Sequence, residues 1–214
     1  MLLNHLGLAF HGLGRFKEAR DCFEQALARH REVGDRQGEA TALNSLGLAL
    51  HGLGRTQEAI SDFVRAARIQ QELGDRRGEA LTRVNLGRAF GGLGHSAKAR
   101  HHLTCARSAF AALPDPYNEA RVLHSLGRLY VRSGQADTAI GHLQSALGIM
   151  REVGSQFEEA QVLEVLGDAV RLTGDERTAR SHYQQALAIY QEIGGPHADR
   201  LRDRVESSTS LGGG

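Results

Sequence analysis

Histidine side chains, eleven in this 214-residue chain, are the first candidates for metal or proton chemistry. His102, His142 and His182 recur at intervals of 40 residues. A zinc ion needs nitrogen ligands about 2 Å away, whereas equivalent positions on packed helices lie roughly 10 Å apart. This column therefore cannot share one ion, and we predict that it lies on an outward-facing surface. His11 and His51 are better candidates for hydrogen bonds to a ligand.

The sequence contains no recognisable catalytic motif. The run Gly91–Gly94 lacks both the preceding strand and the Gly-Lys-Ser/Thr ending of a phosphate-binding loop. Cys22 and Cys105 have no metal-ligand spacing, so we expect two reduced thiols. The sequence therefore predicts a protein that is not an enzyme and that has no cofactor and no metal site.

Arginine and asparagine side chains recur at spacings of three and four residues, as on one face of a series of helices. Arginine binds carboxylates through two parallel hydrogen bonds. We predict a groove that binds an acidic or C-terminal segment of a peptide, with Asn4, Asn44 and Asn85 on its backbone amides. The alternative is a solvated polar face. The predicted groove residues are Asn4, Leu8, Asn44, Leu48, His51, Asn85, Arg88, Arg121, His124, Arg128, Arg132, Glu164, Asp168 and Arg171.

The helices that must position these residues can be predicted from a repeat with a period of 40 residues. Leu-Gly pairs begin at Leu6, Leu46, Leu86, Leu126 and Leu166. A second glycine follows at Gly14, Gly54, Gly94, Gly134 and Gly174. A large apolar residue follows at Phe23, Phe63, Leu103, Leu143 and Tyr183, between two alanines of each copy. Five copies in register predict a tandem-repeat protein.

Each copy has the pattern of two helices. In the second copy Leu43, Leu46, Leu50 and Leu53 form one stripe of a helix with 3.6 residues per turn. Gly54 follows, where a left-handed cap would end this helix. A second amphipathic stretch runs over residues 56–73 and ends before another glycine, as do its counterparts at Gly34, Gly154 and Gly194.

This pattern resembles the tetratricopeptide repeat family over residues 1 to about 193. The period is 40 residues rather than 34, and the usual proline after the second helix is absent. The segments Glu32–Asp35 and Glu72–Asp75 resemble the long-repeat branch found in bacterial (actinobacterial-type) signal-transducing STAND ATPases and antibiotic-regulatory proteins. The resemblance implies a right-handed α-solenoid whose first helices line a concave binding surface.

We therefore expect an all-α solenoid of five helix-turn-helix repeats in a single domain over residues 1–206. Its repeats are approximately 1–36, 37–76, 77–116, 117–156 and 157–196, followed by a capping helix over 197–206 and a flexible tail over 207–214. Met1 falls where the next copy has Thr41. We therefore expect that the chain is part of a longer protein or that a partner covers repeat one, and self-association through this uncapped repeat is a further expectation.

The predicted function is a protein–protein interaction scaffold or sensor, the C-terminal part of a larger bacterial regulator in the cytoplasm. Its partner would be a protein or peptide. The alternative is nucleic-acid contact through the arginines of repeats three and four. A net charge of +1 and an aromatic content of 5% make nucleic acid a poor partner, because stacking platforms are few. No apolar run is long enough to span a membrane.

Overall fold

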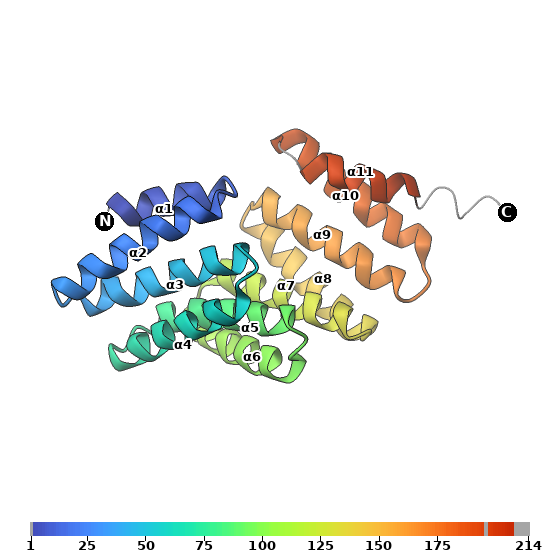
Figure 1. Ribbon diagram of the computed structural model, residues 1–214. Helices are drawn as coiled ribbons and strands as arrows, with labels where there is room; N and C mark the ends of the chain where they lie inside the picture. Colours follow the sequence, from blue (N-terminus) through green and yellow to red (C-terminus); the bar gives the residue numbers. More distant parts are fainter. Residues whose placement is uncertain (1, 195–196, 208–214) are drawn as a thin grey trace. The chain divides into compact units, whose positions relative to one another are not determined.

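The computed structural model describes residues 2–194 and 197–207, which form a series of helices (Figure 1). All regular structure in these residues is α-helical, which confirms the predicted all-α class. Each predicted repeat contains two helices joined by a tight turn, here named the A helix and the B helix. The helices are α1 (Leu2–Gly12), α2 (Phe16–Glu32), α3 (Arg36–Gly52), α4 (Thr56–Glu72), α5 (Arg76–Gly92), α6 (Ser96–Ala112), α7 (Pro116–Arg132), α8 (Ala136–Glu152), α9 (Gln156–Arg171), α10 (Glu176–Ile193) and α11 (His197–Ser207).

Glycine ends these helices, as the sequence predicts. Gly54 has a φ of 77°, a left-handed conformation that costs an L-residue with a side chain roughly 1–2 kcal/mol. A positive φ also occurs at Gly14, Gly34, Gly74, Gly94, Gly134, Gly154, Gly174 and Gly194. Proline occupies the matching position at Pro114. The glycines therefore fix where one helix stops and the next begins.

Aspartate begins several of the A helices. The Asp35 carboxylate accepts a hydrogen bond from the backbone N–H of Gly38 at 2.8 Å, and Asp75 does the same for Gly78. Asp115 accepts from the backbone N–H of Asn118 at 3.1 Å. Each bond satisfies an amide that has no partner inside its helix, which is typically worth about 1 kcal/mol. These caps set the starting point of the A helices.

The A and B helices of one repeat approach closely at the glycine of the Leu-Gly pair. A Cβ atom added to Gly47 would lie 2.6 Å from the ring of Phe63, closer than any real Cβ contact. The same relation joins Gly7 to Phe23, Gly87 to Leu103, Gly127 to Leu143 and Gly167 to Tyr183. All five large side chains are buried. The recurring glycine therefore gives the large B-helix side chain the space it fills.

The chain divides into two compact units, one that ends at Leu113 and one that begins at Pro114. In the first unit α1, α3 and α5 pack against one another in order, and α2 and α4 each pack against the A helices before and after them. In the second unit α7 packs against α9, and α8 packs against both. Each unit has its own buried core. The single domain over residues 1–206 and its repeat limits stay predictions.

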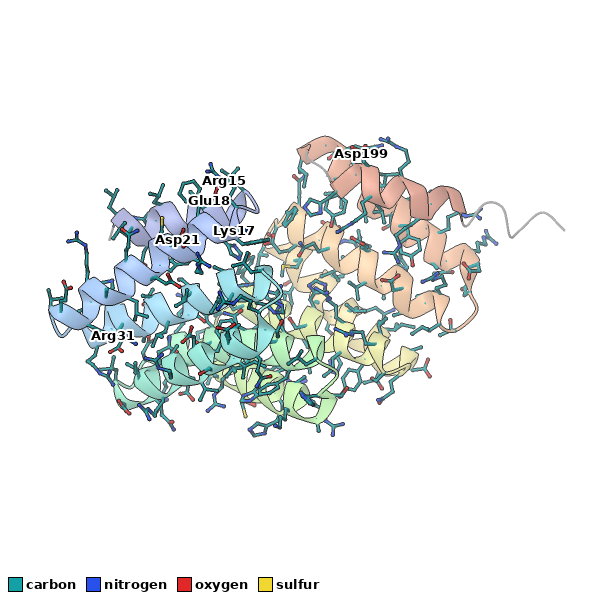
Figure 2. All side chains as sticks on the ribbon, viewed as in Figure 1. Arg15, Lys17, Glu18, Asp21, Arg31 and Asp199 are labelled. Carbon is teal, nitrogen blue, oxygen red and sulfur yellow. The ribbon has the colours of Figure 1, made fainter. Side chains whose placement is uncertain are left out.

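The last described helix, α11, packs against α10 and begins at the predicted residue, His197. Its buried residues are Ala198 and Leu201, and Val205 is partly buried. Ser207, predicted to open the flexible tail, is the last residue of α11, and the rest of that predicted tail, residues 208–214, lies outside the described residues. Exposed charged side chains such as Asp199 cover the outer face of α11, and Arg15 and Asp21 do so at α2 (Figure 2).

A substitution tests the contact between glycine and ring. Gly47→Ala is expected to lower the free energy of unfolding by about 1–2 kcal/mol, because overpacking a buried ring costs more than the gain in helix propensity. Gly148→Ala is the control, since its added methyl group meets no atom within 4 Å. This variant should gain roughly 0.5–1 kcal/mol. Urea denaturation followed by circular dichroism measures both, and equal effects would contradict the explanation.

Candidate partner-binding surfaces

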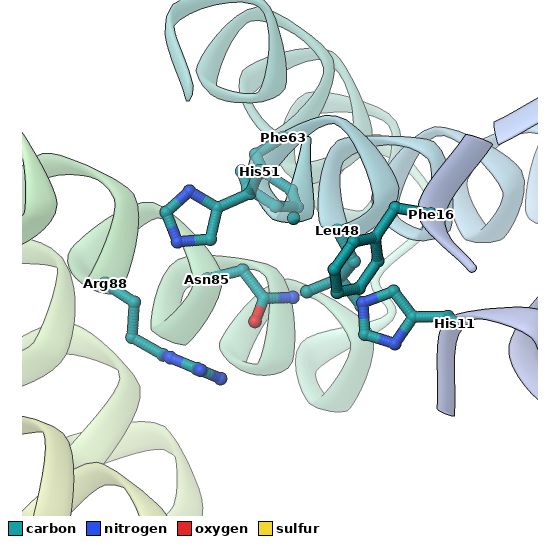
Figure 3. A pocket seen from close by; sticks show the side chains of 8 residues that line it. His11, Phe16, Leu48, His51, Phe63, Asn85 and Arg88 are labelled. Atoms are coloured by element: carbon teal, nitrogen blue, oxygen red, sulfur yellow. The ribbon is translucent and has the colours of Figure 1, made fainter. Parts of the chain in front are cut away.

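A pocket of about 210 Å³ lies on the A-helix side of the first unit. It is lined by side chains from five successive helices, so three repeats contribute to one site. Figure 3 shows the imidazoles of His11 and His51 on separate helices, with the Asn85 side chain of α5 between them in this view. The lining residues are His11, Phe16, Leu48, His51, Gly52, Phe63, Asn85 and Arg88.

Phe16 shapes one wall of this pocket. Its ring lies where a Cβ atom on Gly52 would approach within 2.6 Å, so only glycine fits beneath it. The His11 ring meets Phe16 edge to face, with 5.3 Å between the ring centres (Figure 3). Sequence reasoning missed Phe16, Gly52 and Phe63 as lining residues. Phe16 carried a usable signal, because the matching positions hold Thr56, Ser96, Ala136 and Glu176.

The polar groups of the pocket come from histidine, asparagine and arginine. Burial lowers the pKa of His11 below its usual 6.5, and the positive charge of Arg88 lowers it further. His51 Nδ1 lies 3.1 Å from the Thr56 hydroxyl, which orients its ring. The pocket therefore combines neutral imidazole, an apolar floor at Leu48 and one guanidinium. This set suits an apolar group that carries a negative charge at one end.

The predicted asparagines serve the contact between helices. Asn85 is buried, and its Nδ2 donates to Asn44 Oδ1 at 2.9 Å. Asn44 Oδ1 also accepts from the Thr82 hydroxyl at 3.2 Å, and the Gln70 amide nitrogen donates to that hydroxyl at 2.8 Å. These bonds tie α3, α4 and α5 together. Half-buried Asn4 also has a buried side-chain oxygen, so the amide atoms are less accessible to a peptide than the sequence led us to expect.

The acidic residues predicted in repeat five contact the chain's own last helix. Arg204 of α11 donates to Glu164 Oε1 at 3.0 Å and forms an ion pair with Asp168. The Tyr183 hydroxyl donates to Asp168 at 2.8 Å, and the guanidinium carbon of Arg204 lies 4.8 Å from the centre of the Tyr183 ring. Burial, together with the bond to Asp168, raises the pKa of Tyr183. Arg171 lies 3.8 Å from Asp168 and is exposed.

The basic residues predicted in repeat four differ in exposure. Arg128 and Arg132 are exposed on α7, whereas His124 is half-buried. Half-buried Arg121 donates to Asn118 Oδ1 at 3.0 Å, and its guanidinium lies 5.8 Å from the centre of the Tyr117 ring. Leu8 is exposed on α1, and Arg88 is exposed on α5 at the edge of the pocket. The stripe is thus accessible mainly at its arginines and at Leu8.

The histidine column does not lie on an outward-facing surface, and that prediction was wrong. His102, His142 and His182 are half-buried. The His102 ring stacks on Phe90 with 5.5 Å between ring centres, and His142 stacks on Tyr130 at 5.4 Å. Burial lowers the pKa of His102 and of His182. The rings of His102 and His142 pack between an A helix and its B helix, which the spacing of the column could not reveal.

Within the placed segments 2–194 and 197–207, no cluster of three or more His, Cys, Asp or Glu side chains could hold a metal ion. Across the same segments, none of the helices combines the length and the apolar character that crossing a membrane requires. Cys22 and Cys105 form no disulfide, as the sequence predicts.

The repeat pattern of the chain matches that of a known protein family. The model of the tetratricopeptide repeat family matches residues 1–72, 39–112 and 118–192. The chain belongs to the tetratricopeptide repeat family. No curated protein matches its sequence. The family match confirms the resemblance drawn from the Leu-Gly and Ala positions, and members of the family generally mediate protein–protein interactions.

Solved structures confirm the class of tandem helical repeats that form an α-solenoid. BtubC (BKLC) from P. vanneervenii has a TM-score of 0.75 and 23% identity, with 91% of this chain and 81% of that chain covered. TTC0263, a thermophilic tetratricopeptide repeat protein of Thermus thermophilus, has a TM-score of 0.70 and 23% identity over 97% of each chain. A Rap protein complexed with competence and sporulation factor has a TM-score of 0.72 and 13% identity, with 98% and 63% covered.

The half-buried His11 of the pocket predicts a pH-dependent stability. Because folding lowers the pKa of His11, the unfolded chain binds its proton more readily, and stability is lost as the pH falls below about 6.5. The free energy of unfolding should therefore fall less between about pH 7.5 and about pH 5.5 in His11→Gln than in the unaltered chain. Urea denaturation at the two pH values measures this. Exposed His5 supplies the control variant, His5→Gln, which should behave as the unaltered chain.

Proposed function

We propose that the chain is a protein–protein interaction scaffold that binds a peptide or a partner domain on its A-helix face. The pocket at His11, Leu48 and Arg88 carries this proposal, because it joins three repeats into one concave site. A volume of about 210 Å³ suits a side chain of a protein ligand rather than a large cofactor. Proteins of this fold typically act as scaffolds rather than as enzymes.

The chemistry of the pocket favours a ligand with an apolar side chain next to a carboxylate. Leu48 and Phe16 supply the apolar contacts, and Arg88 supplies a fork that fits a carboxylate. The acidic or C-terminal end of a peptide has this combination. The solved Rap complex with competence and sporulation factor supports a bound ligand on this fold. We also propose that the exposed Arg128 of the second unit binds a carboxylate of such a ligand, as a separate site.

We further propose that this scaffold is the C-terminal part of a larger bacterial regulator of the long-repeat branch, acting in the cytoplasm. Its repeat phrasing at Glu32–Asp35 and Glu72–Asp75 and its use of arginine for 24 of 26 basic residues support this origin. Contact with nucleic acid is the competing function. The affinity for nucleic acid would fall steeply with salt concentration, with a slope set by the number of phosphates neutralised. The experiment below distinguishes the two functions.

Charge reversal in the pocket tests the proposed function. The chain is screened against a library of random seven-residue peptides with free C-termini, and selected peptides are titrated by fluorescence anisotropy. Arg88→Glu should weaken binding by at least about tenfold, because a charge-assisted hydrogen bond is lost and a like charge is introduced. The same peptides with amidated C-termini should bind the unaltered chain about as weakly as the peptides with free C-termini bind the Arg88→Glu chain.

Arg68→Glu is the matched control for that experiment. Arg68 is 72% exposed on α4 and pairs only with Glu72 among the described residues, at 3.5 Å. This variant should bind the selected peptides as the unaltered chain does. Unchanged affinity after Arg88→Glu and Arg128→Glu together would defeat the proposal. Binding of single-stranded DNA that weakens steeply with salt would favour the competing function.

Self-association through repeat one is a second prediction, and one observation favours it. Leu6 is 45% exposed, whereas the matching leucines Leu46, Leu86, Leu126 and Leu166 are buried. Exposed apolar side chains at Leu2 and Leu8 of α1 extend this surface. If copies associate there, Leu6→Glu should shift the mass measured by light scattering towards the monomer. An unchanged mass, or a monomeric unaltered chain, would contradict the prediction.

A further inference from the structure

Repeat five contains a site built for a guanidinium group. Glu164 and Asp168 lie one turn apart on α9, with side chains only 16% and 24% exposed. Two carboxylates at this spacing repel each other, so a cation between them is needed for stability. The Tyr183 ring adds a flat surface on which a guanidinium can lie, and its hydroxyl fixes the Asp168 carboxylate. A planar cation fits these three groups together.

The other repeats have no such acidic pair at the matching positions. Repeat two has Asn44 and Leu48 there, repeat three has Val84 and Arg88, and repeat four has His124 and Arg128. The pair in repeat five lies on the same stripe of the A helix that forms the pocket in the first unit. Its chemistry therefore differs from the rest of the stripe. Within the chain it binds Arg204 of α11, which contacts both carboxylates, and Arg200 of the same helix lies 3.7 Å from Glu164.

Apart from Arg204, helix α11 contacts the second unit through Arg200, which lies 3.7 Å from Glu164, and through a short apolar edge. It spans 11 residues, and helices shorter than about 12–15 residues are marginal in water without packing. Its apolar edge consists of Ala198, Leu201 and Val205, and His197 stacks on Tyr190 with 5.2 Å between ring centres. A segment with so few buried contacts can open locally at low cost while the rest of the unit stays folded.

We propose that α11 is an internal ligand of repeat five, and that an arginine-bearing helix of a partner protein binds the Glu164–Asp168–Tyr183 site in its place. Charge complementarity identifies this partner: a guanidinium satisfies both carboxylates and stacks on the ring, whereas an acidic segment is repelled. The inference rests on the proposed function in one respect, that partners bind the A-helix face. It assigns to repeat five a ligand of opposite charge from the one proposed for Arg88 and Arg128.

A peptide of residues 197–207, labelled at its N-terminus, tests the proposal against the full chain. In the unaltered chain the tethered α11 acts at an effective concentration in the millimolar range, so the peptide should bind weakly. Arg204→Ala in the chain releases the site, and the peptide should then bind at least about tenfold more tightly. The same peptide carrying Arg204→Ala should not bind. Anisotropy measures all three.

Arg202 supplies the matched controls, since it is 49% exposed and bonds Asp199 of its own helix. Arg202→Ala in the chain should leave the peptide's affinity as in the unaltered chain, and Arg202→Ala in the peptide should preserve its binding. If the peptide does not bind the Arg204→Ala chain while α9 and α10 keep their protection from hydrogen exchange, the proposal is overturned. Equal effects of the two arginine substitutions would overturn it as well.

A second variant applies if Arg204→Ala disturbs the folding of α9 and α10. Glu164→Gln keeps the bond between Tyr183 and Asp168 and removes one charge from the site. Hydrogen exchange of α11 should then become at least about tenfold faster while α9 and α10 are unchanged. Unchanged exchange in α11 would overturn the proposal. The Arg88→Glu experiment concerns the first unit, so its failure would leave this result standing, and the reverse also holds.

Discussion

The contact between a glycine of one helix and a large side chain of the next is the constraint on which the structure depends. Gly47 lets the Phe63 ring lie directly on the α3 backbone. Such an approach removes the ring from water completely, and a fully buried phenylalanine contributes about 1.5–3 kcal/mol. With few aromatic residues and no tryptophan, the chain obtains its cores from these contacts together with the alanines around them.

Because the B helices use their apolar faces for these contacts, the polar side chains of the A helices determine what each unit can bind. In the first unit, Asn44 and Asn85 connect neighbouring helices, which leaves Arg88 and the histidines at the pocket. In the second unit, Glu164 and Asp168 face Arg204. The same stripe of a repeated helix therefore serves packing in one place and recognition in another, according to its local partners.

The sequence was sufficient for the fold and insufficient for much of the site. The helices of the repeats and their glycine ends follow from a period of 40 residues, because local spacing determines which face of a helix is buried. The helix α11 follows from the apolar edge that Leu201 and Val205 give to a polar segment. The roles of Asn85 and His102 do not follow from the period. Their neighbours, Asn44 and Phe90, lie on helices whose rotation about their own axes is set by packing. Phe16 can be recognised in the sequence as an exception to the repeat, but its packing over Gly52 cannot.

Both members of each close contact at a Leu-Gly pair, such as Gly47 and Phe63, belong to the same forty residues. A duplicated copy of the gene segment for one repeat would therefore bring its complete internal contact with it, without a compensating change elsewhere. Tyr183 stands where the other copies have phenylalanine or leucine, and its ring keeps the same position over Gly167 while its hydroxyl makes a bond that those side chains cannot make. Lengthening of the array and specialisation of one surface can thus proceed independently.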